Sequence, residues 1–360
     1  MVATAIKTLI STCSLGHIED MLKDPCNRPV TNLRISVTQE CNQRCLYCHR
    51  EGEPARKPRE LLTREEIARI AGVASSLGIE KLKFTGGEPL SRQDLPGIIG
   101  DVAPMFKDVS LTTNGTLLGP LASKLKTAGL HRVNVSLDSV DPETYRRITG
   151  TARVGDAIEG VRSARVAGLS PVKLNMVVLR GLNEAQIPQM MRFAAAEGAV
   201  LQLIELEAPK GGLSGEWYLA HHADLLDIEQ ELSRRAITTR TRRMHHRRTY
   251  LVPVESYMRL SVKGCPQGGG KAVEVEIVRP VHNSEFCQNC NRLRLSSDGR
   301  LVPCLFRADR SVDIAGPLRK GASDADLAGL FKQAVSRREP YWASAPAPVQ
   351  DKAGELGTCP

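Results

Sequence analysis

The sequence predicts an α/β fold, an incomplete (βα)6 parallel barrel followed by a smaller C-terminal α+β extension. Apolar, β-branched runs recur along the chain with helical patterns between them, which is typical of strands that alternate with helices. Six such units lie within residues 26–210, whereas a complete eight-unit barrel usually needs about 250 residues. The predicted strands are 33–37, 82–85, 109–113, 132–137, 172–179 and 200–206.

Helix signals fall between these runs. Thr63 and Glu66 have the spacing of a capping box, which predicts a helix start, and Gly78 predicts the end of that helix. Gly129 and Gly198 predict the ends of two later helices. Connections between parallel strands are nearly always right-handed, so the carboxyl ends of the strands should lie together at one end of the barrel, where ligands gather.

Three cysteines follow the first predicted strand: Cys41, Cys45 and Cys48, in the spacing C-x3-C-x2-C. Three thiolates can hold three irons of a cubic [4Fe–4S] cluster and leave the fourth iron open to a small molecule. A zinc site needs a fourth Cys or His ligand, and His49 follows Cys48 too closely to reach the same ion easily. The plainest alternative is that the cysteines are small buried residues.

A second group of cysteines lies near the C-terminus, with the spacing C-x2-C-x13-C. Cys287, Cys290 and Cys304 also lack a fourth partner, so the two triplets predict two clusters, each with an open iron. Asp298 and Gly299 predict a hairpin turn that brings Cys304 back to the other two cysteines.

Gly86-Gly-Glu-Pro89 follows the second predicted strand. Adjacent glycines allow the backbone to approach a ligand closely, and Glu88 can accept hydrogen bonds from an ammonium group. The same four residues are also an ordinary turn signal. The segments 112–115 and 136–138 hold corresponding places after the third strand and at the end of the fourth.

The composition is basic, with 49 Lys and Arg against 40 Asp and Glu in 360 residues. This excess favours an anionic partner, either a polymer or a small phosphorylated molecule. Arginines gather in 234–248, which forms either a solvated face or a binding patch.

The number of cysteines and the hydropathy of the chain indicate the cellular compartment. The ten cysteines are too sparse for a disulfide scaffold and have metal-like spacings, which predicts a reducing cytoplasm. No apolar run approaches the ~20 residues of a membrane span, and residues 1–25 lack a clear signal-peptide core. With 4% aromatic residues, we expect no base-stacking surface for nucleic acid.

The first triplet, with Tyr47 and the Gly-Gly-Glu-Pro loop, resembles radical S-adenosylmethionine (SAM) enzymes. The block Cys287-x2-Cys290-Asn-Arg-Leu-Arg-Leu-Ser-Ser-Asp-Gly, with Cys304, is similar to the GTP 3′,8-cyclase family that begins molybdenum cofactor synthesis, in its archaeal-type branch. The resemblance covers residues 26–342. It implies that a 5′-deoxyadenosyl radical abstracts the C3′ hydrogen of GTP and that the sugar radical attacks guanine C8, giving 3′,8-cyclo-7,8-dihydro-GTP.

The resemblance also implies a ligand set. Each cysteine triplet would hold a [4Fe–4S] cluster, the first binding SAM and the second binding guanine. The implied SAM contacts are Tyr47, Gly87 and Ser136. The implied GTP contacts are Arg34, Lys83, Thr112, Lys173, Arg292 and Arg294, and the last two are the implied catalytic residues.

The implied partners extend beyond the two substrates. They are a reductant such as flavodoxin or ferredoxin and the downstream cyclic pyranopterin phosphate synthase, and a homodimer is allowed. Many family members carry arginine in the places of Lys83 and Gln202, so the phosphate contacts of this chain should differ from theirs.

The charged residues can also be interpreted directly. Arg34 and Lys173 lie within apolar strands, where a charge is costly unless it points into a ligand cavity. Arg292 and Arg294 are two residues apart and would share one face of a strand, either in the site or as an exposed edge pair.

These features divide the chain into predicted parts: an N-terminal extension at 1–25, a radical SAM partial barrel at 26–210, a C-terminal extension with the second cluster and the GTP site at 211–342, and a flexible tail at 343–360. Two other functions fit less well. One is another two-cluster radical SAM enzyme, such as a peptide maturase. The other is a metal-stabilised nucleic-acid-binding protein that uses 234–248.

Overall fold

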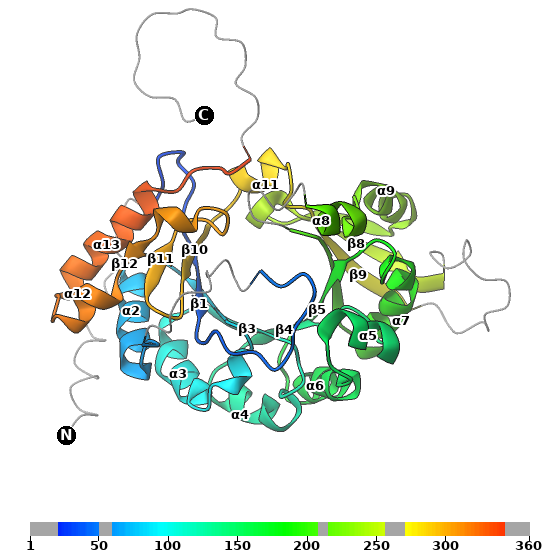
Figure 1. The fold of residues 1–360 in the computed structure, drawn as a ribbon, viewed down its shortest axis with the longest axis horizontal. Helices are drawn as coiled ribbons and strands as arrows, with labels where there is room; N and C mark the ends of the chain where they lie inside the picture. The colour runs from blue at the N-terminus through cyan, green and yellow to red at the C-terminus, as the bar shows by residue number, and fades with distance from the viewer. Residues whose placement is uncertain (1–20, 50–59, 208–214, 256–270, 343–360) are drawn as a thin grey trace, which may run out of the picture.

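The computed structural model describes residues 21–49, 60–207, 215–255 and 271–342. Figure 1 shows a sheet that curves around a central space, with helices on its outer side. The predicted tail at 343–360 and all but the last residues of the predicted extension at 1–25 lie outside the described residues. Within the described ranges, no helix is long and apolar enough to cross a bilayer.

The predicted parallel strands are confirmed, and no boundary differs from its prediction by more than one residue. Each strand pairs in parallel with the next in sequence order. The strands are β1 Asn32–Ser36, β2 Lys81–Thr85, β3 Asp108–Thr113, β4 Arg132–Ser136, β5 Val172–Val178 and β6 Val200–Glu205.

The C-terminal part extends this sheet at both edges, an arrangement that no local sequence pattern predicts. β9 (Ala272–Val278) pairs in parallel with β6, and β10 (Arg292–Leu295) pairs in parallel with β1. The sheet order is β12-β11-β10-β1-β2-β3-β4-β5-β6-β9-β8-β7. Because β9 and β10 do not pair with each other, the barrel is open between them, as predicted.

The remaining strands are antiparallel and flank the parallel row. They are β7 Thr238–Thr241, β8 Arg248–Pro253, β11 Arg300–Val302 and β12 Val312–Asp313.

The helix signals are confirmed at all four places. Gly129 follows the end of α4 (Ala122–Thr127) with a φ of 100°. The Thr63–Glu66 capping box begins α2, and Gly78 follows its end with a φ of 82°, a conformation that glycine adopts without strain. Gly198 ends α7 in the left-handed conformation. The helices are α2 Arg64–Ser76, α3 Leu95–Val102, α4 Ala122–Thr127, α5 Pro142–Thr149, α6 Val154–Val166, α7 Ile187–Glu197, α8 Glu216–His221, α9 Leu226–Arg235, α11 Ser284–Gln288, α12 Ala315–Arg319 and α13 Asp324–Ser336.

The core lies between the strands and the outer helices. Leu33 and Ile35 of β1 have no exposed surface, and both belong to the main apolar cluster. Because side chains alternate along a strand, burying these two residues outward turns Arg34 toward the inside of the barrel. The same alternation in β2 buries Leu82 and Phe84 outward. The apolar core therefore directs polar side chains into the barrel.

A buried ion-pair group ties the ends of the described chain to the second cysteine triplet. The Asp24 carboxylate lies 2.8 Å from Arg28 and 3.1 Å from Arg338, whose side chain is 1% exposed. Arg28 donates to the carbonyl of Cys287 at 2.6 Å, and Arg338 donates to that of Cys290 at 2.8 Å.

We predict that Arg338→Met lowers the free energy of unfolding by about 3–5 kcal/mol, because it leaves a buried carboxylate short of a partner. The control is Arg337→Met: this neighbouring side chain is exposed and, among the described residues, donates to the carbonyls of Arg310 and Ser311. Its cost should stay within about 0.5 kcal/mol. Urea unfolding under identical anaerobic conditions measures both, and equal midpoints for the two variants would contradict the prediction.

Candidate active site

One cavity of about 700 Å³ lies inside the barrel, and all eight parallel strands contribute to its lining. The thiols of the first triplet line it. The second triplet lies just outside it, since the neighbouring residues Phe286, Asn291 and Leu305 are lining residues. The predicted SAM and GTP residues, all of which line the cavity, are Arg34, Tyr47, Lys83, Gly87, Thr112, Ser136, Lys173, Arg292 and Arg294.

The loop of the first triplet is held at the carboxyl ends of the strands by its backbone. The amides of Arg44 and Leu46 donate to the carbonyls of Thr149 and Ile148, at 2.9 and 3.0 Å. Burial raises the pKa of the Cys45 thiol, and the charge of Asp138 raises it further. Since burial disfavours a bare thiolate, positive charge such as that of bound iron is needed to hold the cysteine deprotonated.

The two glycines after β2 allow two backbones to meet. The Gly87 amide donates to the carbonyl of Thr38 at 2.8 Å, and a Cβ added at Gly87 would lie 2.2 Å from the carbonyl oxygen of Glu40. The Glu88 amide then donates to that Glu40 carbonyl at 2.7 Å. The glycine loop therefore fixes the start of the cysteine loop and also presents Gly86 and Gly87 to the cavity.

Glu88 does not face the cavity. Its side chain is fully buried, and it accepts hydrogen bonds from the Thr113 hydroxyl at 2.6 Å and from the amides of Asn114 and Leu90 at 2.7 and 3.0 Å. The expectation that Glu88 binds a ligand ammonium is therefore wrong. The carboxylate joins the loop after β2 to the loop after β3, and so holds Thr113 and Asn114 at the cavity wall.

Tyr47 is positioned by Asp138. The Tyr47 hydroxyl donates to Asp138 Oδ2 at 2.6 Å, and the Val177 amide donates to Oδ1 at 2.9 Å. Burial raises the pKa of Asp138 to about 6, although both hydrogen bonds lower it. Because the Tyr47 hydroxyl already donates to Asp138, a ligand would contact the Tyr47 ring.

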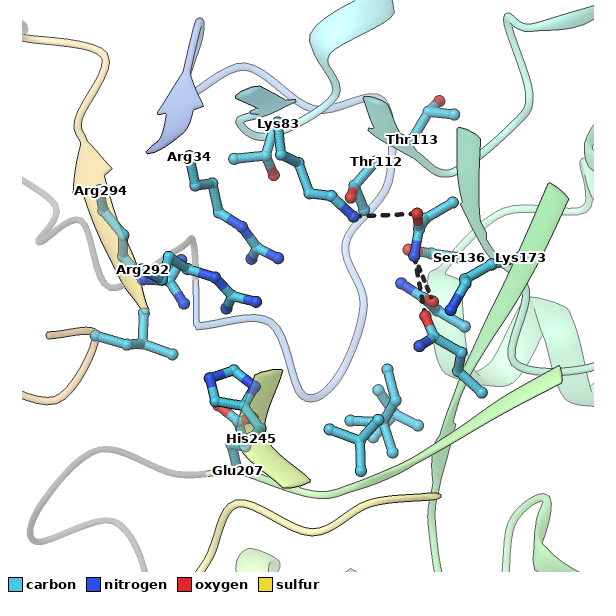
Figure 2. Close-up of a pocket in the computed structure, with 18 of the residues that line it drawn as sticks. Arg34, Lys83, Thr112, Thr113, Ser136, Lys173, Glu207, His245, Arg292 and Arg294 are labelled. Atoms are coloured by element: carbon cyan, nitrogen blue, oxygen red, sulfur yellow. Dashed lines mark hydrogen bonds between the residues drawn. The ribbon is translucent and has the colours of Figure 1, made fainter. Parts of the chain in front are cut away.

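Basic side chains gather deeper in the barrel than the thiols, at the middle of β1 and β2 and along β10, and we call this part of the cavity its cationic end. In the sheet register Arg34 lies beside Arg294 on one side and beside Lys83 on the other. Figure 2 shows Arg34, Lys83 and Arg292 reaching toward one space. Lys83 donates to Asn134 at 3.0 Å, so its side chain is held toward β4, two strands away in the sheet.

Electrostatics at this end favour an anionic ligand. Burial lowers the pKa of Lys83 well below its usual value, and the charges of Arg132 and Arg34 lower it further. Burial likewise lowers the pKa of Arg292, with Arg34 and Arg294 adding to the effect. Each cation is thus destabilised by desolvation and by its neighbours, and a bound anion would relieve both.

The second triplet lies at the edge formed by α11, β10 and β11. The Asp298-Gly299 turn between β10 and β11 is confirmed, with a Gly299 φ of 80°. Burial raises the pKa of Cys304 to about 11, and the charges of Cys290 and Cys287 raise it too, so the thiols are near one another. Burial also raises the pKa of Cys290, but Arg338 and Arg292 outweigh it and the net shift is downward.

Each triplet offers three free thiols, the donor set of a [4Fe–4S] cluster with one open iron. In the described part of the chain, no three His, Cys, Asp or Glu side chains converge closely enough to hold one metal ion. The thiols of each triplet nevertheless interact electrostatically. A cubic cluster spaces its cysteine ligands more widely than zinc does, because each thiolate binds a different iron.

Several lining or supporting residues were not predicted. Asp138 belongs to the segment 136–138, whose place at the end of the fourth strand was predicted, but its hydrogen bond with Tyr47 was not. Glu276 pairs with Lys173 at 2.6 Å across 103 residues of sequence, which no local pattern reveals.

The basic segment 234–248 has two parts with different surroundings. Arg234 and Arg235 pair with Glu231 on α9. Later in the segment, Arg242, Arg243, His245 and Arg247 line the cavity.

Comparison with known proteins gives two matching family models. Residues 35–194 match the radical SAM superfamily, and residues 199–344 match the family described as Molybdenum Cofactor Synthesis C.

Solved structures with a similar fold include Streptococcus suis SuiB bound to its precursor peptide SuiA, with a TM-score of 0.60, 16% identity and coverage of 92% of this chain and 77% of that one. Native anSMEcpe with bound AdoMet is also similar, with a TM-score of 0.53, 17% identity and coverage of 78% and 76%. At these identities the likeness supports the fold alone.

Curated relatives are more informative. The chain is 49% identical over 324 residues to the probable GTP 3′,8-cyclase of Pyrococcus horikoshii, covering 90% of this chain and 99% of the relative. It is 42% identical over 323 residues to the probable GTP 3′,8-cyclase of Methanocaldococcus jannaschii, covering 89% and 99%. With this identity over nearly the whole of each archaeal relative, the chain belongs to the GTP 3′,8-cyclase family of radical SAM enzymes.

Proposed function

We propose that this chain converts GTP to 3′,8-cyclo-7,8-dihydro-GTP, the first step of molybdenum cofactor biosynthesis. The observation that carries the proposal is the polarity of one cavity. Three thiols lie at the carboxyl ends of the parallel strands, and a cluster of cations lies deeper in the barrel, at the middle of β1 and β2 and along β10. A substrate with a reactive sugar and a triphosphate fits between the two ends.

At the thiol end, Cys41, Cys45 and Cys48 would hold the first [4Fe–4S] cluster. When bound, this cluster supplies the electron that splits SAM into methionine and a 5′-deoxyadenosyl radical. The chain's own contribution is placement: Gly87 gives SAM close access to the backbone, and Ser136 and the Tyr47 ring line the wall that it would occupy.

At the second triplet, Cys287, Cys290 and Cys304 would hold the other [4Fe–4S] cluster, whose open iron would give guanine a ligand position. Asn291 and Leu305 join this triplet to the cavity wall. The base would then be held at one edge and the triphosphate at the cationic end. Fixing both ends of GTP orients the ribose C3′ and guanine C8 for ring closure.

The triphosphate would contact the cationic end. Guanidinium forks suit phosphate oxygens bidentately, and Arg34, Arg292 and Arg294 supply three of them. Lys83 and Lys173 add point charges, and the Thr112 hydroxyl is a neutral contact; all three line the cavity. Arg292 and Arg294 act in catalysis by holding the substrate in this orientation.

The partners form a further part of the proposal. Cys41 and Cys48 are exposed, so a one-electron donor such as flavodoxin or ferredoxin could approach the first cluster. The cyclised nucleotide would pass to a cyclic pyranopterin phosphate synthase in the cytoplasm, and the enzyme could act as a homodimer.

The direct test is anaerobic reconstitution with iron and sulfide, followed by incubation with SAM, dithionite and GTP. Mass spectrometry should detect the cyclised nucleotide and 5′-deoxyadenosine. An iron-replete protein that cleaves SAM but leaves GTP unchanged would overturn the proposal in favour of another radical SAM reaction.

We predict that Cys45→Ser abolishes reductive cleavage of SAM, because two remaining thiolates should not keep the first cluster. Chromatography of 5′-deoxyadenosine formed with dithionite is the measurement, and Cys41→Ser should behave alike. Formation of 5′-deoxyadenosine at the parent rate would contradict the prediction.

We predict that Cys290→Ser separates the two clusters. The variant should retain the first cluster, so that about four irons remain and some SAM is still cleaved, while the cyclised nucleotide disappears. Iron analysis and product analysis of the same sample provide the measurement. Full iron content with normal product would mean that this triplet holds no cluster.

We predict that Arg292→Ala and Arg294→Ala each weaken GTP binding by about 1.5–3 kcal/mol through the loss of charge-assisted hydrogen bonds. Anaerobic calorimetry on iron-replete proteins measures the affinity. Iron content should be unchanged, and guanosine, which lacks phosphates, should bind the parent and both variants almost equally. Unchanged GTP affinity would show that neither arginine contacts the triphosphate.

A further inference from the structure

A fully buried carboxylate, Glu276, gathers cations from two separate parts of the chain. It lies on β9, opposite Gln202 of β6 in the sheet register. Lys173 Nζ lies 2.6 Å from Glu276 Oε2, Arg247 Nη1 lies 2.9 Å from Oε1, and Arg242 Nε lies 3.5 Å from Oε2. All three cations line the cavity, whereas Glu276 itself does not.

The charges in this group do not balance. Arg242 also pairs with Glu274 at 2.8 Å, but Glu276 is the one acidic partner of both Lys173 and Arg247 among the described residues. The side chains of Lys173 and Arg247 are only 8% and 11% exposed. One carboxylate therefore serves two nearly buried cations. An excess buried charge is costly unless another anion joins it.

Arg247 pairs with Glu276 without using all of its donors. The contact between Nη1 and Glu276 Oε1 is an ion pair, and neither Oε1 nor the buried Arg247 Nε has a hydrogen-bond partner. Burial lowers the pKa of Arg247 and Glu276 raises it, but Arg242 and Arg34 lower it further. Arg34 belongs to β1, so Arg247 approaches from the other side of the barrel the same cationic end where the triphosphate is proposed to bind.

The hairpin that carries Arg247 is held in place. The Arg242 amide donates to the Arg247 carbonyl at 2.9 Å and closes the turn between β7 and β8. Within that turn the His245 amide donates to the carbonyl of Asn289 at 2.9 Å, and the His245 ring stacks on Phe286 with centroids 3.8 Å apart. Figure 2 shows His245 facing the cavity below Arg292. The hairpin is therefore docked against the segment of the second triplet.

We propose that Arg247 is a further phosphate contact for GTP, supplied by the β7–β8 hairpin, and that Glu276 is the positioning residue that orients Arg247 and Lys173 toward the phosphates. This inference rests on the proposed function. A guanidinium offers five N–H donors, so Arg247 can bind Glu276 through one edge and a phosphate oxygen through another. The ligand class is the phosphate chain of a nucleoside triphosphate.

The test is anaerobic calorimetry of iron-replete protein with GTP, GDP and guanosine. Arg247→Gln should weaken GTP binding at least about tenfold, the scale of a lost hydrogen bond between charged groups. Guanosine affinity and iron content should not change. The control is Arg240→Gln, since Arg240 is an exposed residue of the same hairpin that does not line the cavity. It should bind all three ligands like the parent.

Two results would overturn the inference: unchanged GTP affinity in Arg247→Gln, or an equal loss for GTP and guanosine, which would indicate only a structural role. If Arg247→Gln does not fold, Arg247→Lys keeps the charge and loses the fork, and it should show a smaller loss confined to the phosphorylated ligands. If Arg247→Lys binds GTP with the same affinity as the parent protein, the inference is then overturned. A parent protein that is iron-replete and binds no GTP would instead defeat the proposed function itself.

A double-mutant cycle tests the role of Glu276. Glu276→Gln should change GTP binding without affecting guanosine, and its effect should be smaller in the Arg247→Gln background, because the two residues act through one contact. Equal effects of Glu276→Gln in both backgrounds would show that it does not position Arg247.

Discussion

The whole site depends on the alternation of side chains along parallel strands. Each strand of the row buries one face under the outer helices, as Leu33 and Ile35 do in β1, and turns the residue between them inward. Barrel interiors of this kind are usually filled by branched apolar residues. Here the inward residues include Arg34 and Lys83, so the interior is a polar cavity rather than a packed core. The cost of desolvating those cations makes an anion the natural ligand of this fold.

The direction of the strands then separates two chemistries. Cysteines need a loop that can wrap around a cluster, and such loops follow the carboxyl ends of the strands. That loop is fixed by backbone contacts, because Gly87 lets the chain after β2 touch residues 38–40. Cations instead project from within β1, β2 and β10, where their backbone is held by the sheet. A substrate must therefore span the barrel to meet both ends, which fixes its orientation before any reaction.

Local patterns predicted the six central strands because their apolar runs are long and β-branched. They did not predict β9, in which glutamates alternate with valines. For β10, in which arginines alternate with leucines, they predicted a short strand but not its pairing with β1. Alternation did predict that Arg292 and Arg294 share a face. What local patterns could not supply are pairs between distant residues, such as Lys173 with Glu276. Glu88 was misassigned for a related reason, since only the fold reveals that Thr113 and Asn114 occupy its oxygens.

Arg292 links the second cysteine triplet electrostatically to the cationic end of the cavity. It follows Cys290 by two residues, it faces the cavity, and its charge lowers the pKa of the Cys290 thiol while Cys290 raises the pKa of Arg292. The positive potential offered to phosphate therefore depends on the thiolates beside it, and the stability of those thiolates depends on the arginine. The charge of Arg338 also lowers the pKa of the Cys290 thiol, and Arg338 forms an ion pair with Asp24. Through this chain of charges the described N-terminal segment, the second triplet and the cationic end of the cavity form one electrostatic unit, so the second cluster site and the phosphate site stabilise each other.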